Sequence, residues 1–210
     1  MTQGPLGIKA QGVGKRHGRQ WILRNIDLEL IPGSVFAILG SNGSGKSSLL
    51  RIMCGFDRAS EGHVTCIQDG AMVPPMDLPM AIAYGAPDQD LIPQLDVTEH
   101  IALHHRLRRP MPSLDAAATL TLARLEDKGT TRVGDLSSGM RQRLALALAF
   151  STDCGALFLD EPTSHLDDAG IAWYGELVRT HRAGRTLVVA SNHNPAEYPG
   201  IQGTLELQMG

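Results

Sequence analysis

The sequence predicts an α/β fold in which a mainly parallel sheet is flanked by helices. Short apolar runs, typical of buried strands, alternate with longer amphipathic stretches that are typical of helices. One strand-to-helix junction also carries a glycine-rich segment of the kind that cradles phosphate groups. The chain has 210 residues, 42% of them hydrophobic, which is enough for one domain with a sizeable core.

The strand candidates are recognised by their apolar patterns. Toward the end of Trp21–Leu30 apolar and polar residues alternate, with apolar residues at positions 22, 26, 28 and 30. Leu205, Leu207 and Met209 alternate near the C-terminus and predict a last short strand. The other candidates are continuous apolar runs, as in strands covered on both faces: Val35–Leu39, Ala81–Tyr84, Ala156–Asp160 and Leu187–Ala190.

Helical patterns lie between these strands. Ser47–Cys54 places apolar residues at 49, 50, 52 and 53 on one face, and Gly55 stands where the helix would end. The stretch from about 89 to 135 has no strand candidate, and it predicts a helical subdomain inserted into a single domain of residues 1–210. Other helices are predicted over Val97–Leu107, Leu114–Leu125, Arg141–Phe150 and Gly170–His181.

Charge and cysteine content exclude several classes of protein. A net charge of −3 gives no electrostatic reason to expect a nucleic acid partner. Cys54, Cys66 and Cys154 contain no CxxC and are interpreted as buried thiols in a reducing compartment. The Met1 segment lacks the apolar stretch of a signal peptide, and no apolar run approaches the ~20 residues of a membrane span. We therefore expect a cytoplasmic protein, with any membrane role supplied by a partner.

The glycine-rich segment predicts a site for MgATP. It matches G-x-x-x-x-G-K-[ST] between a predicted strand and a predicted helix, where backbone N–H groups and the helix dipole form an anion cradle. In such a loop the lysine reaches the β- and γ-phosphates and the serine hydroxyl binds Mg²⁺. The residues expected to bind the nucleotide are Gly40, Ser41, Asn42, Gly43, Ser44, Gly45, Lys46, Ser47 and Ser48, with Ser47 also a Mg²⁺ ligand.

Two carboxylates complete the predicted reaction centre. The apolar run Ala156–Asp160 ends in Asp160 and is followed directly by Glu161. Asp160 at the strand end is placed to hold Mg²⁺ through water, and Glu161 to orient and deprotonate the attacking water.

Several further segments resemble motifs of the ATP-binding cassette (ABC) ATPases. Leu136-Ser137-Ser138-Gly139-Met140 is similar to the signature sequence of that family, with departures at Ser138 and Met140. Ser164-His165-Leu166-Asp167 resembles the D-loop, and His193 resembles the switch histidine. The resemblance covers nearly the whole chain and implies the ABC type of P-loop NTPase fold. That fold has an N-terminal antiparallel β portion and an inserted helical subdomain.

The resemblance also implies how two chains share a site. In the family the signature closes over the ATP held by another subunit, with the Ser137 hydroxyl and the Gly139 N–H meeting the γ-phosphate. Two ATP molecules would then lie between two cassettes, either two copies of this chain or this chain and another. Asp167 belongs to the D-loop of that arrangement, and His193 would contact the γ-phosphate and position Glu161.

Two positions of the sequence depart from the family pattern. The family stacks adenine on an aromatic residue near the N-terminus, and by position His17 stands there, although a solvated loop residue explains it equally well. The family also places a glutamine near the metal after a strand like Ala81–Tyr84. An ungapped alignment puts Pro87 at that position, so Gln89 is the candidate for an additional Mg²⁺ ligand only if the loop bulges.

Two clusters of polar residues in the predicted helical subdomain have simpler explanations. His100, His104 and His105 have a helical spacing that can bind a metal, but polar helix faces carry histidine often. Arg106, Arg108 and Arg109 are explained as a solvated helix end.

Taken together, the residues and the resemblance predict the ATP-hydrolysing subunit of an ABC transporter. ATP-driven dimer closure would act on a separate integral membrane subunit, so the chain would lie at the inner face of the membrane. One alternative is a soluble ABC ATPase that acts on a cytosolic assembly. Such relatives carry two cassettes or a long coiled-coil insertion, and this sequence has neither. A low-turnover nucleotide-binding regulator is the other alternative.

Overall fold

The strands form two sheets. The computed structural model describes residues 2–87 and 91–208. An antiparallel sheet has the order β2-β1-β4-β5, and a parallel sheet has the order β6-β7-β8-β3-β9. The antiparallel sheet contains β1 (Leu6–His17), β2 (Gln20–Leu30), β4 (Glu61–Gln68) and β5 (Ala71–Met72). The parallel sheet contains β3 (Val35–Leu39), β6 (Ile82–Gly85), β7 (Ala156–Asp160), β8 (Thr186–Ser191) and β9 (Gly203–Glu206).

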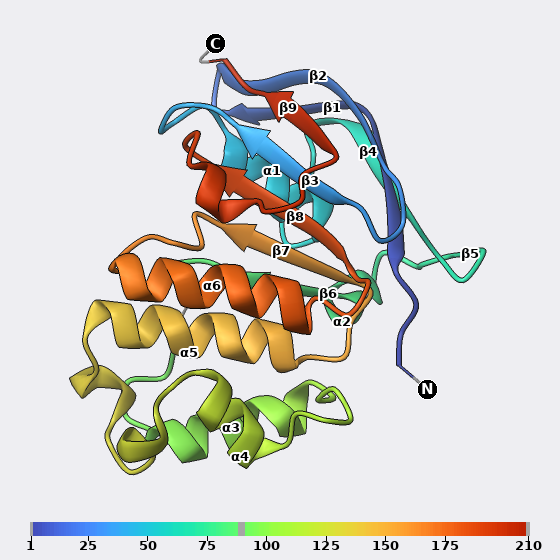
Figure 1. The fold of residues 1–210 in the computed structure, drawn as a ribbon. Helices are drawn as coiled ribbons and strands as arrows, with labels where there is room; N and C mark the ends of the chain where they lie inside the picture. The colour runs from blue at the N-terminus through green and yellow to red at the C-terminus, as the bar shows by residue number, and fades with distance from the viewer. Residues whose placement is uncertain (1, 88–90, 209–210) are drawn as a thin grey trace.

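The helices cover the parallel sheet and form a further layer beyond it. Figure 1 shows α5 and α6 beneath the sheet, with α3 and α4 below α5. The helices are α1 (Lys46–Met53), α2 (Leu78–Ala81), α3 (Val97–Leu107), α4 (Ala116–Leu122), α5 (Ser138–Ser151) and α6 (Asp168–His181). Short 3₁₀ turns lie at η1 (Glu126–Lys128), η2 (Val133–Asp135) and η3 (Pro195–Glu197). The predicted α/β class with a parallel sheet flanked by helices is confirmed.

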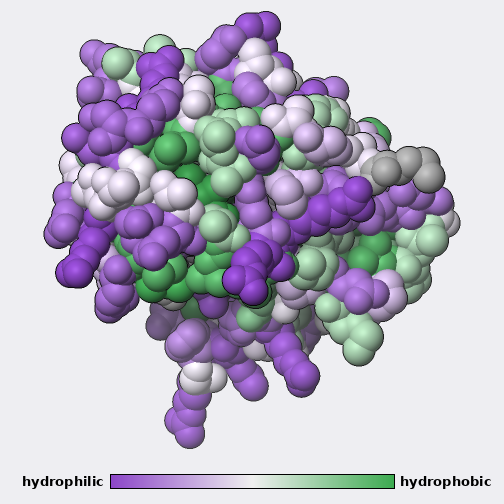
Figure 2. Space-filling model, turned by 90° about the horizontal axis from the view of Figure 1, so that it is seen from below, coloured by the Kyte–Doolittle hydropathy of each residue, from purple (hydrophilic) through white to green (hydrophobic). Residues whose placement is uncertain are grey.

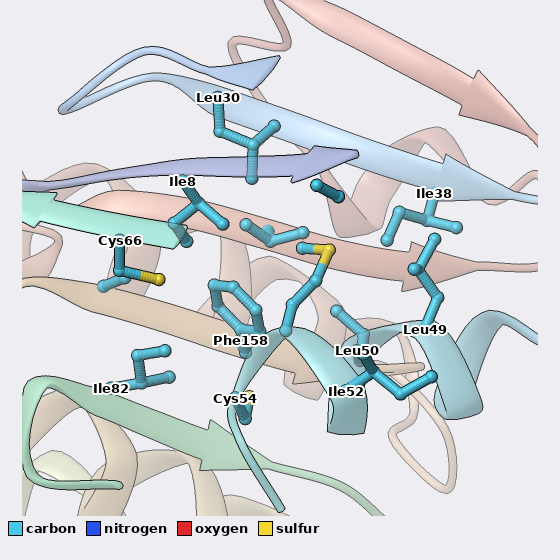
Figure 3. Close-up of a cluster of buried hydrophobic side chains, with 14 of the residues drawn as sticks. Ile8, Leu30, Ile38, Leu49, Leu50, Ile52, Cys54, Cys66, Ile82 and Phe158 are labelled. Carbon is cyan, nitrogen blue, oxygen red and sulfur yellow. The ribbon is translucent and has the colours of Figure 1, made fainter. Parts of the chain in front are cut away.

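Apolar side chains on both faces of the parallel sheet build the core. One cluster fills the space between the two sheets and around α1, where Phe158 of β7 meets Ile8, Leu50 and Cys66 (Figure 3). The neighbouring residues Leu157 and Leu159 belong to a second cluster, which packs against α5 and α6. A third cluster joins α5 to α3 and α4. Because alternate residues of β7 face opposite layers, its sequence is apolar throughout, as expected for a buried parallel strand.

The outer face of the helical layer is mostly polar. Seen from that side, hydrophilic side chains cover most of the surface and hydrophobic ones show through in patches (Figure 2). The longest helices in residues 2–87 and 91–208 have 14 residues, and none of those described is long and apolar enough to cross a membrane.

Several elements differ from the sequence pattern, and three of them do so for a local reason. The pattern misses β1, because irregular pairing between Ala10 and Lys15 interrupts its alternation. The pattern also misses β4, because the first residues of this strand are exposed and give little apolar signal. The helix predicted over Leu114–Leu125 is shorter, Ala116–Leu122, since the Asp115 carboxylate caps it by accepting a hydrogen bond from the Ala118 N–H.

The cysteines are free and buried, as predicted. Burial raises the pKa of Cys54 and Cys154, and it raises the pKa of Cys66 to about 12. A buried thiol with a raised pKa is almost entirely protonated near neutral pH.

Candidate functional site

The glycine-rich loop lies between the end of β3 and the start of α1. Its last glycine, Gly45, is the N-cap residue of α1, and no side chain caps the helix there. The first turn of a helix has N–H groups without intrahelical partners, and the helix dipole adds positive charge at this end. An uncapped N-terminus at the end of a buried strand is therefore suited to an anion.

Gly45 is required by both backbone conformation and space. Its φ is +95°, a region that side chains rarely adopt. A Cβ at this position would lie 2.8 Å from the side chain of Leu23 and 2.9 Å from that of Ile22. Strand β2 therefore packs closely against the loop at Gly45.

Lys46 is folded into the loop. Its side chain is 4% exposed. The Nζ atom donates hydrogen bonds to the carbonyl oxygens of Gly40, at 2.8 Å, and Ser41, at 3.1 Å. The same Nζ lies 3.7 Å from a carboxylate oxygen of Glu161. A lysine charge thus sits between the loop and the carboxylate that sequence reasoning assigned as the base.

One cavity brings the loop and the two carboxylates together. It has a volume of about 460 Å³ and includes both Asp160 and Glu161 in its wall. Ile22 of β2 also lines the cavity, and the sequence did not predict this role because its pattern marks Ile22 only as an apolar strand residue. The other lining residues are Asn42, Gly43, Gly45, Lys46, Ser47, Ser48 and Pro87.

Asp160 is buried at the end of β7 and is held by two hydroxyl groups. The Tyr84 hydroxyl donates to its Oδ2 at 3.2 Å, and the Ser47 side chain also hydrogen-bonds it. Burial raises the pKa of Asp160, and these two hydrogen bonds partly offset the rise. The sequence predicted both Ser47 and Asp160 as groups that hold Mg²⁺, whereas Tyr84 was missed. The Tyr84 hydroxyl near the end of β6 can be recognised as a partner of Asp160 only once β6 and β7 are known to be neighbours.

Asp160→Asn is expected to stabilise the fold, raising the melting temperature by about 2 to 4 °C at neutral pH. A raised pKa means that ionising Asp160 costs stability in the folded state. This cost is absent below the ordinary carboxyl pKa of about 4 and grows as the pH rises through the raised value. Melting curves from about pH 4 to 8 measure the difference. Equal melting temperatures for the two proteins across this range would contradict the conclusion that ionised Asp160 destabilises the fold.

Glu161 has an unusual backbone conformation that the loop after it stabilises. Its φ is +42°, and its N–H donates to the Ala190 carbonyl of β8 at 2.9 Å. Farther along, the buried Glu197 accepts hydrogen bonds from the N–H and the hydroxyl of Thr163. Hydrogen bonds thus join the segments that follow β7 and β8, and they fix the backbone position of Glu161.

The two histidines expected near the nucleotide do not line this cavity. His193 has φ +58°, and its Nε2 lies 3.2 Å from a carboxylate oxygen of Glu206. His17 is exposed at the end of β1, where the chain turns at Gly18. Neither side chain is part of the wall of the loop cavity, so adenine stacking by His17 and the γ-phosphate contact of His193 both stay predictions.

The signature and D-loop segments form a second cavity of about 300 Å³. Ser137 caps α5 by accepting from the Met140 N–H, and Asp167 caps α6 by accepting from the Gly170 N–H. A Cβ on Gly139 would lie 2.9 Å from the His165 carbonyl, so this position needs glycine. The cavity is lined by Ser137, Ser138, Gly139, Met140, Arg143, His165, Leu166, Asp167 and Gly170, and it shares none of them with the loop cavity. Leu136 is buried and does not line this cavity.

The chemistry of the loop cavity fits MgATP. The uncapped helix N-terminus and Lys46 suit phosphate groups, and the Ser47 hydroxyl beside the Asp160 carboxylate supplies the oxygen ligands that Mg²⁺ prefers. Pro87 lines the same cavity and offers no side-chain ligand. Gln89, the candidate for an additional ligand, lies outside the described residues.

The three histidines of α3 make structural hydrogen bonds. The His100 Nε2 accepts from the Ile92 N–H, and the His104 Nε2 pairs with the Thr152 hydroxyl. Burial lowers the pKa of His104 to about 4. His105 pairs with the Ser151 hydroxyl. Within residues 2–87 and 91–208 no group of three or more His, Cys, Asp or Glu residues is placed to hold a metal ion.

A third cavity adjoins the loop cavity. It has a volume of about 530 Å³ and shares Ser47, Pro87 and Asp160 with the loop cavity. Its other walls come from α1, β6, α3, α5 and the segments that follow them. Phe56, which follows α1, is 43% exposed and packs edge-on against Tyr84. A molecule in this third cavity would touch residues that also surround the predicted nucleotide site.

Comparison with known proteins identifies similar chains over most of this length. A family model described as ABC transporter matches residues 23–164, which include the phosphate loop, the signature segment and Glu161. The uncharacterized ABC transporter ATP-binding protein YybJ of Bacillus subtilis (strain 168) is 28% identical over 89% of this chain and 85% of its own length. The cytochrome c biogenesis ATP-binding export protein CcmA of Agrobacterium fabrum is 31% identical over 97% of this chain and 95% of its own length.

A solved structure has a similar fold. It is the dimeric structure of a post-hydrolysis state of the ATP-binding cassette MJ0796 bound to ADP and Pi. It superposes with a TM-score of 0.76 at 26% identity, covering 96% of this chain and 94% of that one.

Proposed function

Because the chain belongs to the ABC transporter family of ATP-binding proteins and is an ATP hydrolase, we propose that it powers a transporter whose membrane-spanning part is a separate chain. The observation that carries the proposal is the cavity in which the phosphate loop meets Asp160 and Glu161. The named relatives support the transport role, since one is an ABC transporter ATP-binding protein and another an ATP-binding export protein.

In this proposal each residue of the loop cavity has one task. The N–H groups at the start of α1 and the Lys46 ammonium bind the phosphates, while Ser47 and Asp160 hold Mg²⁺. Glu161 orients a water molecule and accepts its proton. Mg²⁺, when bound, neutralises charge that develops on the transferred phosphate oxygens.

The signature cavity supports a site shared between two chains. Ser137 and Gly139 surround the N-terminus of α5, a second helix end suited to an anion, but in a cavity separate from the loop cavity. In a dimer the signature cavity of one chain would close over the phosphates held by the other. The partner would be a second copy or another cassette.

The third cavity supports coupling to the membrane partner. A segment of the partner that enters it would contact Phe56 and Tyr84, and Tyr84 hydrogen-bonds the proposed metal ligand Asp160. Occupation of this cavity would then alter the geometry of Asp160 directly.

Isolation of the tagged chain from solubilised membranes of its own cells tests the transport role. We expect a polytopic membrane protein to co-purify in mild detergent and to raise the ATPase rate. Recovery of the chain with a cytosolic assembly instead would favour a soluble ABC ATPase and contradict the proposal.

Ser137→Ala tests the shared site. We expect hydrolysis to fall about tenfold or more, because the γ-phosphate loses a donor from the second chain, while ATP affinity of the separate chain changes little. Ser137→Thr keeps a hydroxyl and the helix cap and serves as the control.

In a mixture of Ser137→Ala and Lys46→Ala chains, one of the two sites of each mixed dimer is intact. A mixture no more active than the two variants apart would contradict sharing.

A further inference from the structure

Glu206 and His193 meet across the strand that leads into the phosphate loop. In the parallel sheet β3 lies between β8 and β9. Leu39, the last residue of β3, pairs with Ser191 on one side and with Glu206 on the other. His193 follows β8 by two residues, and its Nε2 lies 3.2 Å from the Glu206 carboxylate. The contact therefore spans the end of β3, immediately before Gly40.

The backbones on both sides of this contact are fixed, while the two side chains are free to separate. After β8 the Asn194 N–H donates to the Ser191 hydroxyl, and the Asn194 side chain donates to the Thr163 hydroxyl. On β9 the Leu207 N–H donates to the Leu39 carbonyl at 2.8 Å. The side chains of His193 and Glu206 are 53% and 51% exposed. A pair as exposed as this one is only weakly stabilising, so a competing acceptor can break it.

We propose that Glu206 is a positioning residue that competes with the nucleotide phosphates for the Nε2 atom of His193. The inference rests on the proposed function and on the family resemblance, which implies that His193 contacts the γ-phosphate of the bound ATP. The Nε2 of an imidazole carries at most one proton, so it donates to the Glu206 carboxylate or to a phosphate oxygen at a given moment. Glu206 thus holds His193 in a resting position and lowers the basal rate of hydrolysis.

Removal of this competitor is expected to raise the activity modestly. Glu206→Gln keeps the size of the side chain and removes its charge, and we expect kcat to rise about two- to fivefold and affinity for a non-hydrolysable ATP analogue to rise similarly. In a His193→Ala background the same substitution should change neither quantity. Glu29→Gln is the matched control, since it removes an exposed carboxylate that pairs with Lys9 at 4.0 Å on the antiparallel sheet.

A measurement without nucleotide separates this inference from the proposed function. The imidazole NMR signals of His193, identified by their loss in His193→Ala, should move on Glu206→Gln and stay in place on Glu29→Gln. An unchanged signal, a fall in activity on Glu206→Gln, or an effect that persists in the His193→Ala background would each overturn the proposal. Failure of the chain to act with a membrane protein would overturn the proposed function and leave these comparisons valid.

Discussion

Replacing Glu161 by glutamine is expected to lower ATP hydrolysis by about two orders of magnitude or more while ATP binding persists. Glutamine has the same size and can still hydrogen-bond a water molecule, but it cannot accept the proton. The side chain of Glu161 lies in the loop cavity and is 34% exposed, so the substitution should leave the fold intact. A phosphate-release assay and calorimetric ATP titration measure the two effects.

The same variant reports on assembly. If two chains share their sites, Glu161→Gln should accumulate as an ATP-bound dimer in size-exclusion chromatography, because the step that opens the dimer is blocked. Glu61→Gln, an exposed change on β4, controls for the loss of charge. Normal hydrolysis would contradict the role of Glu161 as base, and a monomer at saturating ATP would contradict the shared site.

Lys46→Ala is expected to weaken MgATP binding about 100-fold or more. Lys46 is the charged side chain that the loop motif directs at the phosphates, and it is buried beside Gly40 and Ser41. Its removal leaves the helix N-terminus in place, so weak binding should persist. Lys9→Ala, an exposed lysine on β1, is the control. Calorimetry measures the affinity, and an unchanged dissociation constant would exclude the loop as the nucleotide site.

The sequence predicted the parallel part of the fold well because its strands are buried on both faces. Val35–Leu39 and Ala156–Asp160 are confirmed with the same bounds. The antiparallel sheet was harder to predict, since irregular pairing in β1 and exposure of β4 weaken the alternation on which such predictions depend.

The phosphate loop could be located because its residues are contiguous and its flanks are regular. The surroundings of the site could not, since they depend on which strands are neighbours. Tyr84 reaches Asp160 only because β6 lies beside β7. His193 reaches Glu206 only because β3 lies between β8 and β9, an order that the sequence pattern does not encode.

The burial of the cysteines has a practical consequence for labelling. Cys54, Cys66 and Cys154 are at most 1% exposed, and burial raises the pKa of all three thiols. Maleimide reagents attack the thiolate, so the native protein should be nearly inert to them. A single cysteine introduced at an exposed position would then be the selective attachment point for a fluorophore or spin label. Distances between two labelled chains could be followed without first removing any native cysteine.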